Sequence, residues 1–122
     1  MPIDPEILLK KELDEVEGSW TEERVILYNI AVGSSQDPLN KSDLEFTVGS
    51  NPKVIPSFAA CIYPMESVFS IIGSEGLEVS LTSLLHGEQK ITIHKDIPSS
   101  GTAVTKATIT AVEDYKKFAS VT

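Results

Sequence analysis

The clearest periodic pattern in the chain predicts a helix over about residues 20–32. Apolar residues recur there every three or four positions, which places them on one helix face; they are Val25, Tyr28 and Val32. Ser19 stands three residues before Glu22, the spacing of a capping box that satisfies free N–H groups at a helix start. Gly33 can adopt the left-handed conformation in which many helices end. The predicted helix therefore has a signal at both ends.

Alternating apolar and polar residues predict four strands elsewhere in the chain. They span residues 44–48, 89–94, about 102–112 and 118–122. Residues 77–85 are ambiguous between a strand and a loosely wound segment. The last predicted strand runs to the final residue of the sequence, and a sheet edge left open is a liability. We therefore expect the domain to be incomplete at its C-terminal end.

Prolines delimit a second predicted helix. Pro56 suits the first turn of a helix, and Pro64 must stop or kink it because proline has no backbone N–H to donate. The small residues Ala59 and Ala60 suit a helix that packs tightly within a sheet. Apolar residues then repeat at helical spacing up to Gly73, which predicts a further helical stretch; they are Met65, Val68, Phe69 and Ile72.

Length and charge narrow the classes of protein. The 122 residues fit one domain, read as residues 18–122, after an acid-rich N-terminal arm of residues 1–17 that is expected to be a short helix or a surface arm. The net charge is −8, and the lysines form only two adjacent pairs, so binding to nucleic acid is not expected. No apolar run approaches the ~20 residues of a membrane helix, and no signal peptide is expected. The single cysteine, Cys61, excludes an internal disulfide.

Three motifs resemble one known family. The first is residues 28–33 followed by Asp37-Pro38, and the second is residues 43–47 followed by 53–58. The most specific is Leu84-Leu85-His86-Gly87-Glu88-Gln89, followed by Ile97-Pro98 and Gly101. In this order and at these separations, they are similar to the N-terminal hot-dog half of MaoC-like dehydratases, the (R)-specific enoyl-CoA hydratases also called hydratase 2. The resemblance covers about residues 18–122.

This resemblance implies an α+β hot-dog fold, in which a curved antiparallel sheet wraps around a central helix. It implies reversible addition of water to a trans-2-enoyl-CoA in fatty-acid or related acyl-CoA metabolism, without a cofactor. In the family an aspartate and a histidine of the C-terminal half activate the water, in a Gly-Asp-x-Asn-Pro-x-His type motif that this chain lacks. The turn at residues 114–117 also departs from the family, which usually has a glycine there.

The chain is accordingly expected to be the non-catalytic half that forms the acyl-CoA groove. It would need a catalytic hot-dog half, on the same polypeptide or as a separate subunit, and would act as a dimer or pseudo-dimer of hot-dog units. No membrane insertion is expected. The family's hydratases work in the bacterial cytoplasm or in peroxisomes, so one of these compartments is expected here.

The candidate site residues form two sets and include no catalytic residue. Residues expected to line the acyl groove, or to be ordinary core, are Phe58, Ile62, Met65 and Phe69. Residues expected in a loop at the interface near the substrate are His86, Gly87, Glu88 and Gln89. For His86 we favour a different role, in which its ring bonds a backbone carbonyl and fixes the turn, since one histidine without an oriented partner transfers protons poorly.

Other chemistry is weakly supported by the sequence. A nucleophile and base formed by Cys61 and His86 would need an electropositive, partly exposed cysteine, whereas Cys61 stands in an apolar run. Glu88 could pair with Asp37 or Asp43, but 18 acids make chance pairs common, and the two histidines do not match a zinc pattern. Two alternatives stay open: a stand-alone hot-dog thioester-binding protein or thioesterase, and a structural interaction module with a dead site.

Overall fold

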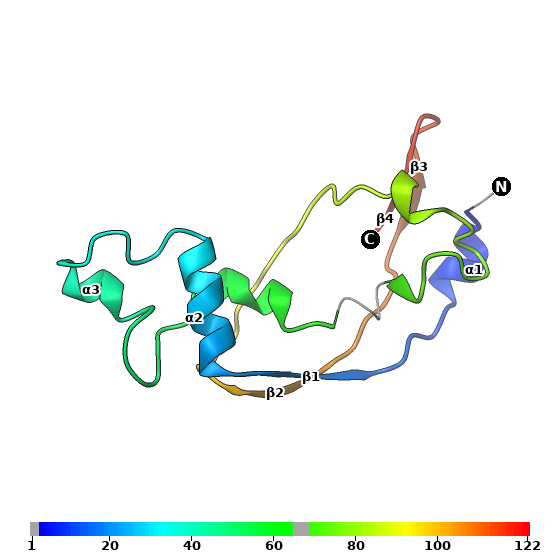
Figure 1. Cartoon of the computed structure of the whole chain (residues 1–122). Helices are drawn as coiled ribbons and strands as arrows, with labels where there is room; N and C mark the ends of the chain where they lie inside the picture. Colours follow the sequence, from blue (N-terminus) through cyan, green and yellow to red (C-terminus); the bar gives the residue numbers. More distant parts are fainter. Residues whose placement is uncertain (1–2, 65–68) are drawn as a thin grey trace. The chain divides into compact units, whose positions relative to one another are not determined.

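The computed structural model describes residues 3–64 and 69–122. Its elements, labelled in Figure 1, are α1 (Pro5–Leu9), β1 (Val16–Trp20), α2 (Glu22–Ala31), α3 (Lys41–Leu44), the 3-10 helices η1 (Pro56–Cys61) and η2 (Leu81–Ser83), β2 (Gly101–Thr105), β3 (Val112–Asp114) and β4 (Ala119–Val121). β1 pairs with β2, and β3 pairs with β4. The chain is therefore α+β with two short sheets, which confirms the predicted class and is consistent with a partial hot-dog fold.

The chain forms two compact units, each with its own core. The first unit comprises Met1–Val16, Pro64–Gln89 and Thr105–Thr122, and the second comprises Glu17–Tyr63 and Lys90–Val104. In the first unit Leu8, Leu77 and Ile109 are buried together. Leu8 belongs to α1, which Asp4 caps by accepting hydrogen bonds from the N–H groups of the first turn. The N-terminal segment thus supplies a core side chain to its unit.

The β3–β4 hairpin of the first unit confirms the strand predicted near residue 118. The two strands are antiparallel, with Val112 opposite Val121. At the turn between them Lys116 adopts a left-handed φ of +67°, a conformation that glycine adopts most easily. In this turn a lysine therefore adopts the left-handed conformation that the family's usual glycine would adopt more easily.

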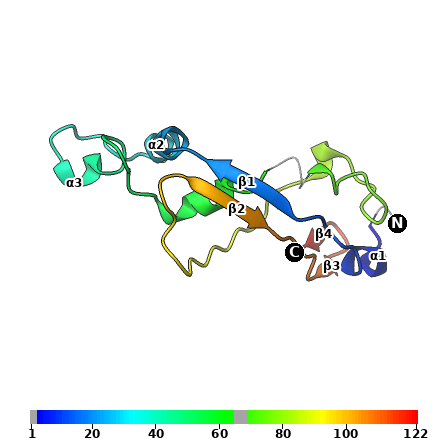
Figure 2. The ribbon, with the colours of Figure 1, turned by 90° about the horizontal axis from the view of Figure 1, so that it is seen from below.

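The second unit is built on the β1–β2 pair and on α2. Figure 2 shows that β1 and β2 run in opposite directions. α2 lies within the helix predicted from the sequence, and Gly33 follows it with a left-handed φ of +100°, as expected. The cap is different: Thr21, and not Ser19, accepts a hydrogen bond from the Arg24 N–H. The predicted apolar face is also narrower, because Val32 is about half exposed.

The strand predicted over residues 44–48 is wrong. Its first residue ends α3, and turns follow. Asn40 caps α3, and Asp43 accepts a hydrogen bond from the Ser35 N–H. Such local side-chain to backbone bonds compete with extended structure. Val48 is 61% exposed, so the alternating pattern does not bury all of its apolar side chains on one face.

Two further strand predictions need correction. The apolar and polar residues of 89–94 alternate, but the segment forms no strand. A strand needs a paired neighbour, and none pairs with this segment in the described part of the chain. The long strand predicted over 102–112 is replaced by β2 and β3, with residues 106–111 outside any strand. The ambiguous residues 77–85 are loosely wound: Leu77 forms an isolated bridge with Ile3, and η2 follows.

The proline-bounded helix is present but is shorter and tighter than predicted. η1 spans Pro56–Cys61, with Pro56 at its start. Its hydrogen bonds join residues three apart, as in the bond from the Phe58 N–H to the Ile55 carbonyl at 2.9 Å. The helical repeat expected from Met65 lies partly outside the described residues. No helix in the described ranges is long and apolar enough to span a membrane.

Candidate functional site

An aromatic cluster forms the core of the second unit. The Phe58 side chain is fully buried, and its ring meets those of Trp20 and Tyr28 edge-on, with centroid distances of 6.5 and 5.4 Å. Ile62 packs against the same cluster. The structure therefore brings together two of the predicted groove residues, Phe58 and Ile62, in one apolar environment.

Polar groups fix the edges of this cluster. The Trp20 Nε1 donates a 2.8 Å hydrogen bond to the Pro98 carbonyl, and the Tyr28 hydroxyl donates to Ser57 Oγ at 2.7 Å. Both rings are thus held at their polar ends while their apolar bodies pack. Neither ring was assigned to the site from the sequence. In the sequence Tyr28 stands out as a position on an apolar helix face and as the start of a family motif, whereas Trp20, the single tryptophan, has no periodic signal.

The sole arginine joins α2 to the end of η1. The Arg24 guanidinium donates to the Cys61 carbonyl at 2.6 Å and to the Ser19 carbonyl at 3.3 Å. The first of these bonds satisfies the carbonyl of the last residue of η1, which has no partner within such a short helix. Cys61 itself is half-buried and packs against the aromatic cluster, in line with the expected role as a small core residue.

A second polar group lies near the start of α2. Glu22 Oε1 accepts a 2.8 Å hydrogen bond from the Asn51 N–H. The buried Ser99 hydroxyl lies 3.1 Å from the same oxygen and 2.9 Å from Asn51 Oδ1, so its single proton can bond either. This network ties two loops to the helix. It is hydrogen-bonded within itself, which is typical of a structural role.

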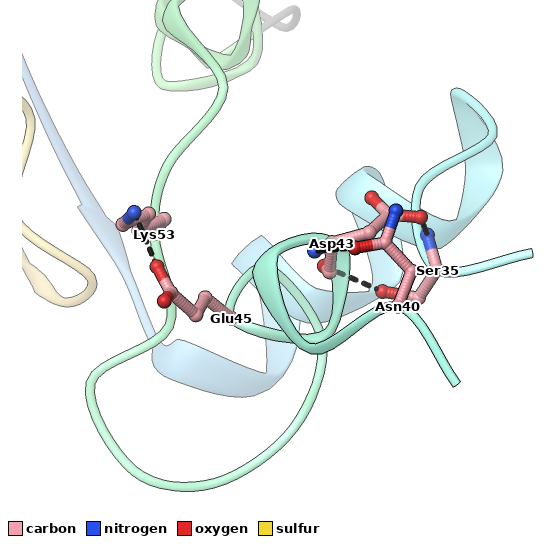
Figure 3. Close-up of polar contacts among 5 residues, drawn as sticks. All are labelled: Ser35, Asn40, Asp43, Glu45 and Lys53. Atoms are coloured by element: carbon pink, nitrogen blue, oxygen red, sulfur yellow. Dashed lines mark hydrogen bonds and ion pairs between the residues drawn. The ribbon is translucent and has the colours of Figure 1, made fainter. Parts of the chain in front are cut away.

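The loop after α2 contains a compact set of polar contacts, shown in Figure 3. The Ser35 N–H donates to Asp43 Oδ2 at 2.7 Å, and Asn40 Oδ1 accepts from the Asp43 N–H at 3.3 Å. Lys53 and Glu45 form an ion pair between exposed side chains, which contributes little to stability. Asp43 is one of the acids considered for a carboxylate pair, and here it orders the loop.

Asn29 is the fully buried polar side chain of α2. Its amide nitrogen donates to the carbonyls of Phe46 and Lys53, at 2.7 and 2.8 Å. Its Oδ1 is buried and has no hydrogen-bond partner among the described residues. This role is not predictable from the sequence, because an asparagine inside a helical repeat is usually exposed. The side chain holds both ends of the loop 46–53 against α2.

The interface residues predicted from the sequence lie in the first unit and are all exposed: His86, Gly87, Glu88 and Gln89. The His86 Nε2 donates to the Glu88 carbonyl at 3.1 Å, so its ring bonds a backbone carbonyl as expected, but residues 84–90 form no turn that this bond could fix. Among the described residues, no carboxylate pairs with either histidine. Phe69 also belongs to the first unit and is 45% exposed, whereas Met65 lies outside the described residues.

The described residues were also considered as ligands of a metal and as the base of a thioesterase. Within residues 3–64 and 69–122, no group of three His, Cys, Asp or Glu side chains is arranged as metal ligands would be. The first turn of η1 contains no acidic residue that could act as the base of a thioesterase. The described residues thus offer apolar packing surface and backbone-directed hydrogen bonds.

Comparison with known proteins decides the family. The family described as the MFE-2 hydratase 2 N-terminal domain matches residues 19–122. The chain belongs to this family.

Curated relatives of the domain are hydratases and dehydratases. The chain is 29% identical to an enoyl-CoA hydratase of Mycobacterium tuberculosis, over 99% of this chain and 43% of that protein. It is 27% identical to the peroxisomal enoyl-CoA hydratase 2 of Arabidopsis thaliana, over 93% of this chain and 38% of that protein. A 3-hydroxyacyl-thioester dehydratase of M. tuberculosis is 27% identical over 78% of the chain and 31% of its own length. The chain thus spans between 31% and 43% of the length of these relatives.

The comparisons confirm the resemblance seen in the three sequence motifs and support a role within the hydratase 2 family. The matched range includes the aromatic cluster, the Asn29 contacts and the exposed residues 86–89.

Proposed function

We propose that this hydratase 2 domain is the non-catalytic half of an (R)-specific 2-enoyl-CoA hydratase, and that it forms the groove for the acyl chain. The observation that carries the proposal is the aromatic cluster around Phe58, in a family domain whose described histidines have no acid to orient them. A general base needs such a partner and a position near the substrate. The acid and base therefore come from a catalytic half, in the same polypeptide or in a separate subunit.

The apolar cluster suits an acyl chain because each buried methylene contributes ~0.8 kcal/mol to binding. Phe58 is fully buried and Ile62 packs beside it, so a ligand there would replace side-chain contacts of the cluster. Phe69 belongs to the other unit and Met65 lies outside the described residues, so the proposed lining rests on Phe58 and Ile62. Longer acyl chains reach further into such a lining, so changes in it affect long substrates most.

The interface with the catalytic half is proposed to involve segment 84–93, which includes His86, Gly87, Glu88 and Gln89. Every residue of this segment is exposed. In the described part of the chain, the backbone N–H groups of residues 85–93 donate to no partner. An extended segment of this kind can gain hydrogen bonds by pairing with a strand of another unit. This domain and the catalytic half would then form the dimer or pseudo-dimer expected of hot-dog proteins.

The groove is tested by substrate-length kinetics on the protein assembled with its catalytic half. Phe58→Leu keeps the site apolar but removes the ring that meets Trp20 and Tyr28. We expect a several-fold lower kcat/KM with a long substrate such as decenoyl-CoA, and a smaller change with crotonyl-CoA. The matched control is Phe118→Leu, since Phe118 is 65% exposed on the β3–β4 hairpin. Equal losses at both chain lengths would overturn the groove assignment.

The same preparation separates the alternatives. Hydrolysis of acyl-CoA by the chain without a catalytic half would indicate a stand-alone thioesterase. Failure to bind any acyl-CoA, alone or assembled, would indicate a structural module. For the compartment, we propose the bacterial cytoplasm, or the peroxisome in a eukaryotic host, where the Arabidopsis relative is named as peroxisomal.

A further inference from the structure

We draw no further inference here: the strongest candidate, the exposed extended segment 84–93 with its apolar side chains at Leu85 and Ile91, belongs to the interface already proposed, and nothing in the described part of the chain shows what else covers it.

Discussion

At the scale of single residues, the second unit depends on polar side chains that act on the backbone. Asn29 donates to two carbonyls that stand seven residues apart in sequence, those of Phe46 and Lys53. A buried carbonyl left without a donor costs about 1–3 kcal/mol, which exceeds the net gain from a typical hydrogen bond. The Asn29 amide therefore stabilises the loop by supplying a donor to both of these part-buried carbonyls.

We predict that Asn29→Ala lowers the free energy of unfolding by roughly 1–3 kcal/mol, because two part-buried hydrogen bonds are lost. Equilibrium unfolding in urea measures this difference. Asn40→Ala is the matched control: Asn40 is exposed and caps only the four-residue helix α3, so its loss should cost ~1 kcal/mol or less. Similar losses for the two variants would show that the Asn29 bonds are not critical.

A second prediction concerns Tyr115, whose hydroxyl donates to Glu113 Oε2 at 2.9 Å. This hydrogen bond and the negative charge of Glu113 raise the pKa of Tyr115 above its usual value of 10.0. Any support that the contact gives to the folded hairpin is present below the unfolded pKa and is lost as the pH rises through the folded pKa. Glu113→Gln should lower the tyrosine pKa, as followed by tyrosinate absorbance. Asp114→Asn is the control, and an equal shift in it would contradict a specific contact with Glu113.

At the scale of elements, the accuracy of the sequence predictions depended on how local their causes were. α2 was predicted because its apolar spacing and its terminal Gly33 are local signals. The strand predicted over 44–48 does not form. The prediction was wrong because the Ser35–Asp43 bonds, which order this loop, have no simple sequence signature. Segment 89–94 has a strand pattern but no paired neighbour in the described structure, and pairing cannot be read from alternation alone.

The candidate site was predictable to a similar extent. Phe58 and Ile62 share one apolar environment, and both stand in a short apolar run that begins at a proline, whereas Phe69 of the same predicted set belongs to the other unit. Trp20 and Tyr28 were missed, since their contact with Phe58 joins segments about 30 or more residues apart in sequence. The bond from His86 to a backbone carbonyl was predictable because its partner is only two residues away, whereas the expected turn is not formed.

The cap of α2 provides a prediction at this scale. Thr21 Oγ1 accepts from the Arg24 N–H, whereas the Ser19 side chain was the cap expected from sequence. Thr21→Ala should therefore lower the free energy of unfolding by ~1 kcal/mol. Ser19→Ala should change it by only a few tenths, because the contact of Ser19 with Arg24 is through its backbone carbonyl. Thermal unfolding of both variants decides the cap, and a larger loss for Ser19→Ala would restore the capping box.

At the scale of the whole molecule, two small cores leave much apolar surface in contact with water. Among the described residues, each unit buries three hydrophobic side chains at its centre. Several others are strongly exposed, among them Leu27 at 69%, Leu39 at 87% and Leu85 at 91%. Small cores give marginal stability, and binding to the folded state raises stability by mass action. The proposed catalytic half should therefore stabilise this chain as well as complete the enzyme.

This leads to a prediction for the assembled protein. With the two halves prepared as separate polypeptides, the unfolding temperature of this chain should rise as the catalytic half is added, because that half binds only the folded state. Ile91→Lys should weaken this rise by placing a charge in segment 84–93, where Ile91 is 36% exposed. Leu39→Lys is the control, since Leu39 is more exposed but lies in the loop before α3. If the mixed halves catalyse hydration but Ile91→Lys and Leu39→Lys change the unfolding temperature equally, the interface lies outside segment 84–93. The proposed function would then still stand.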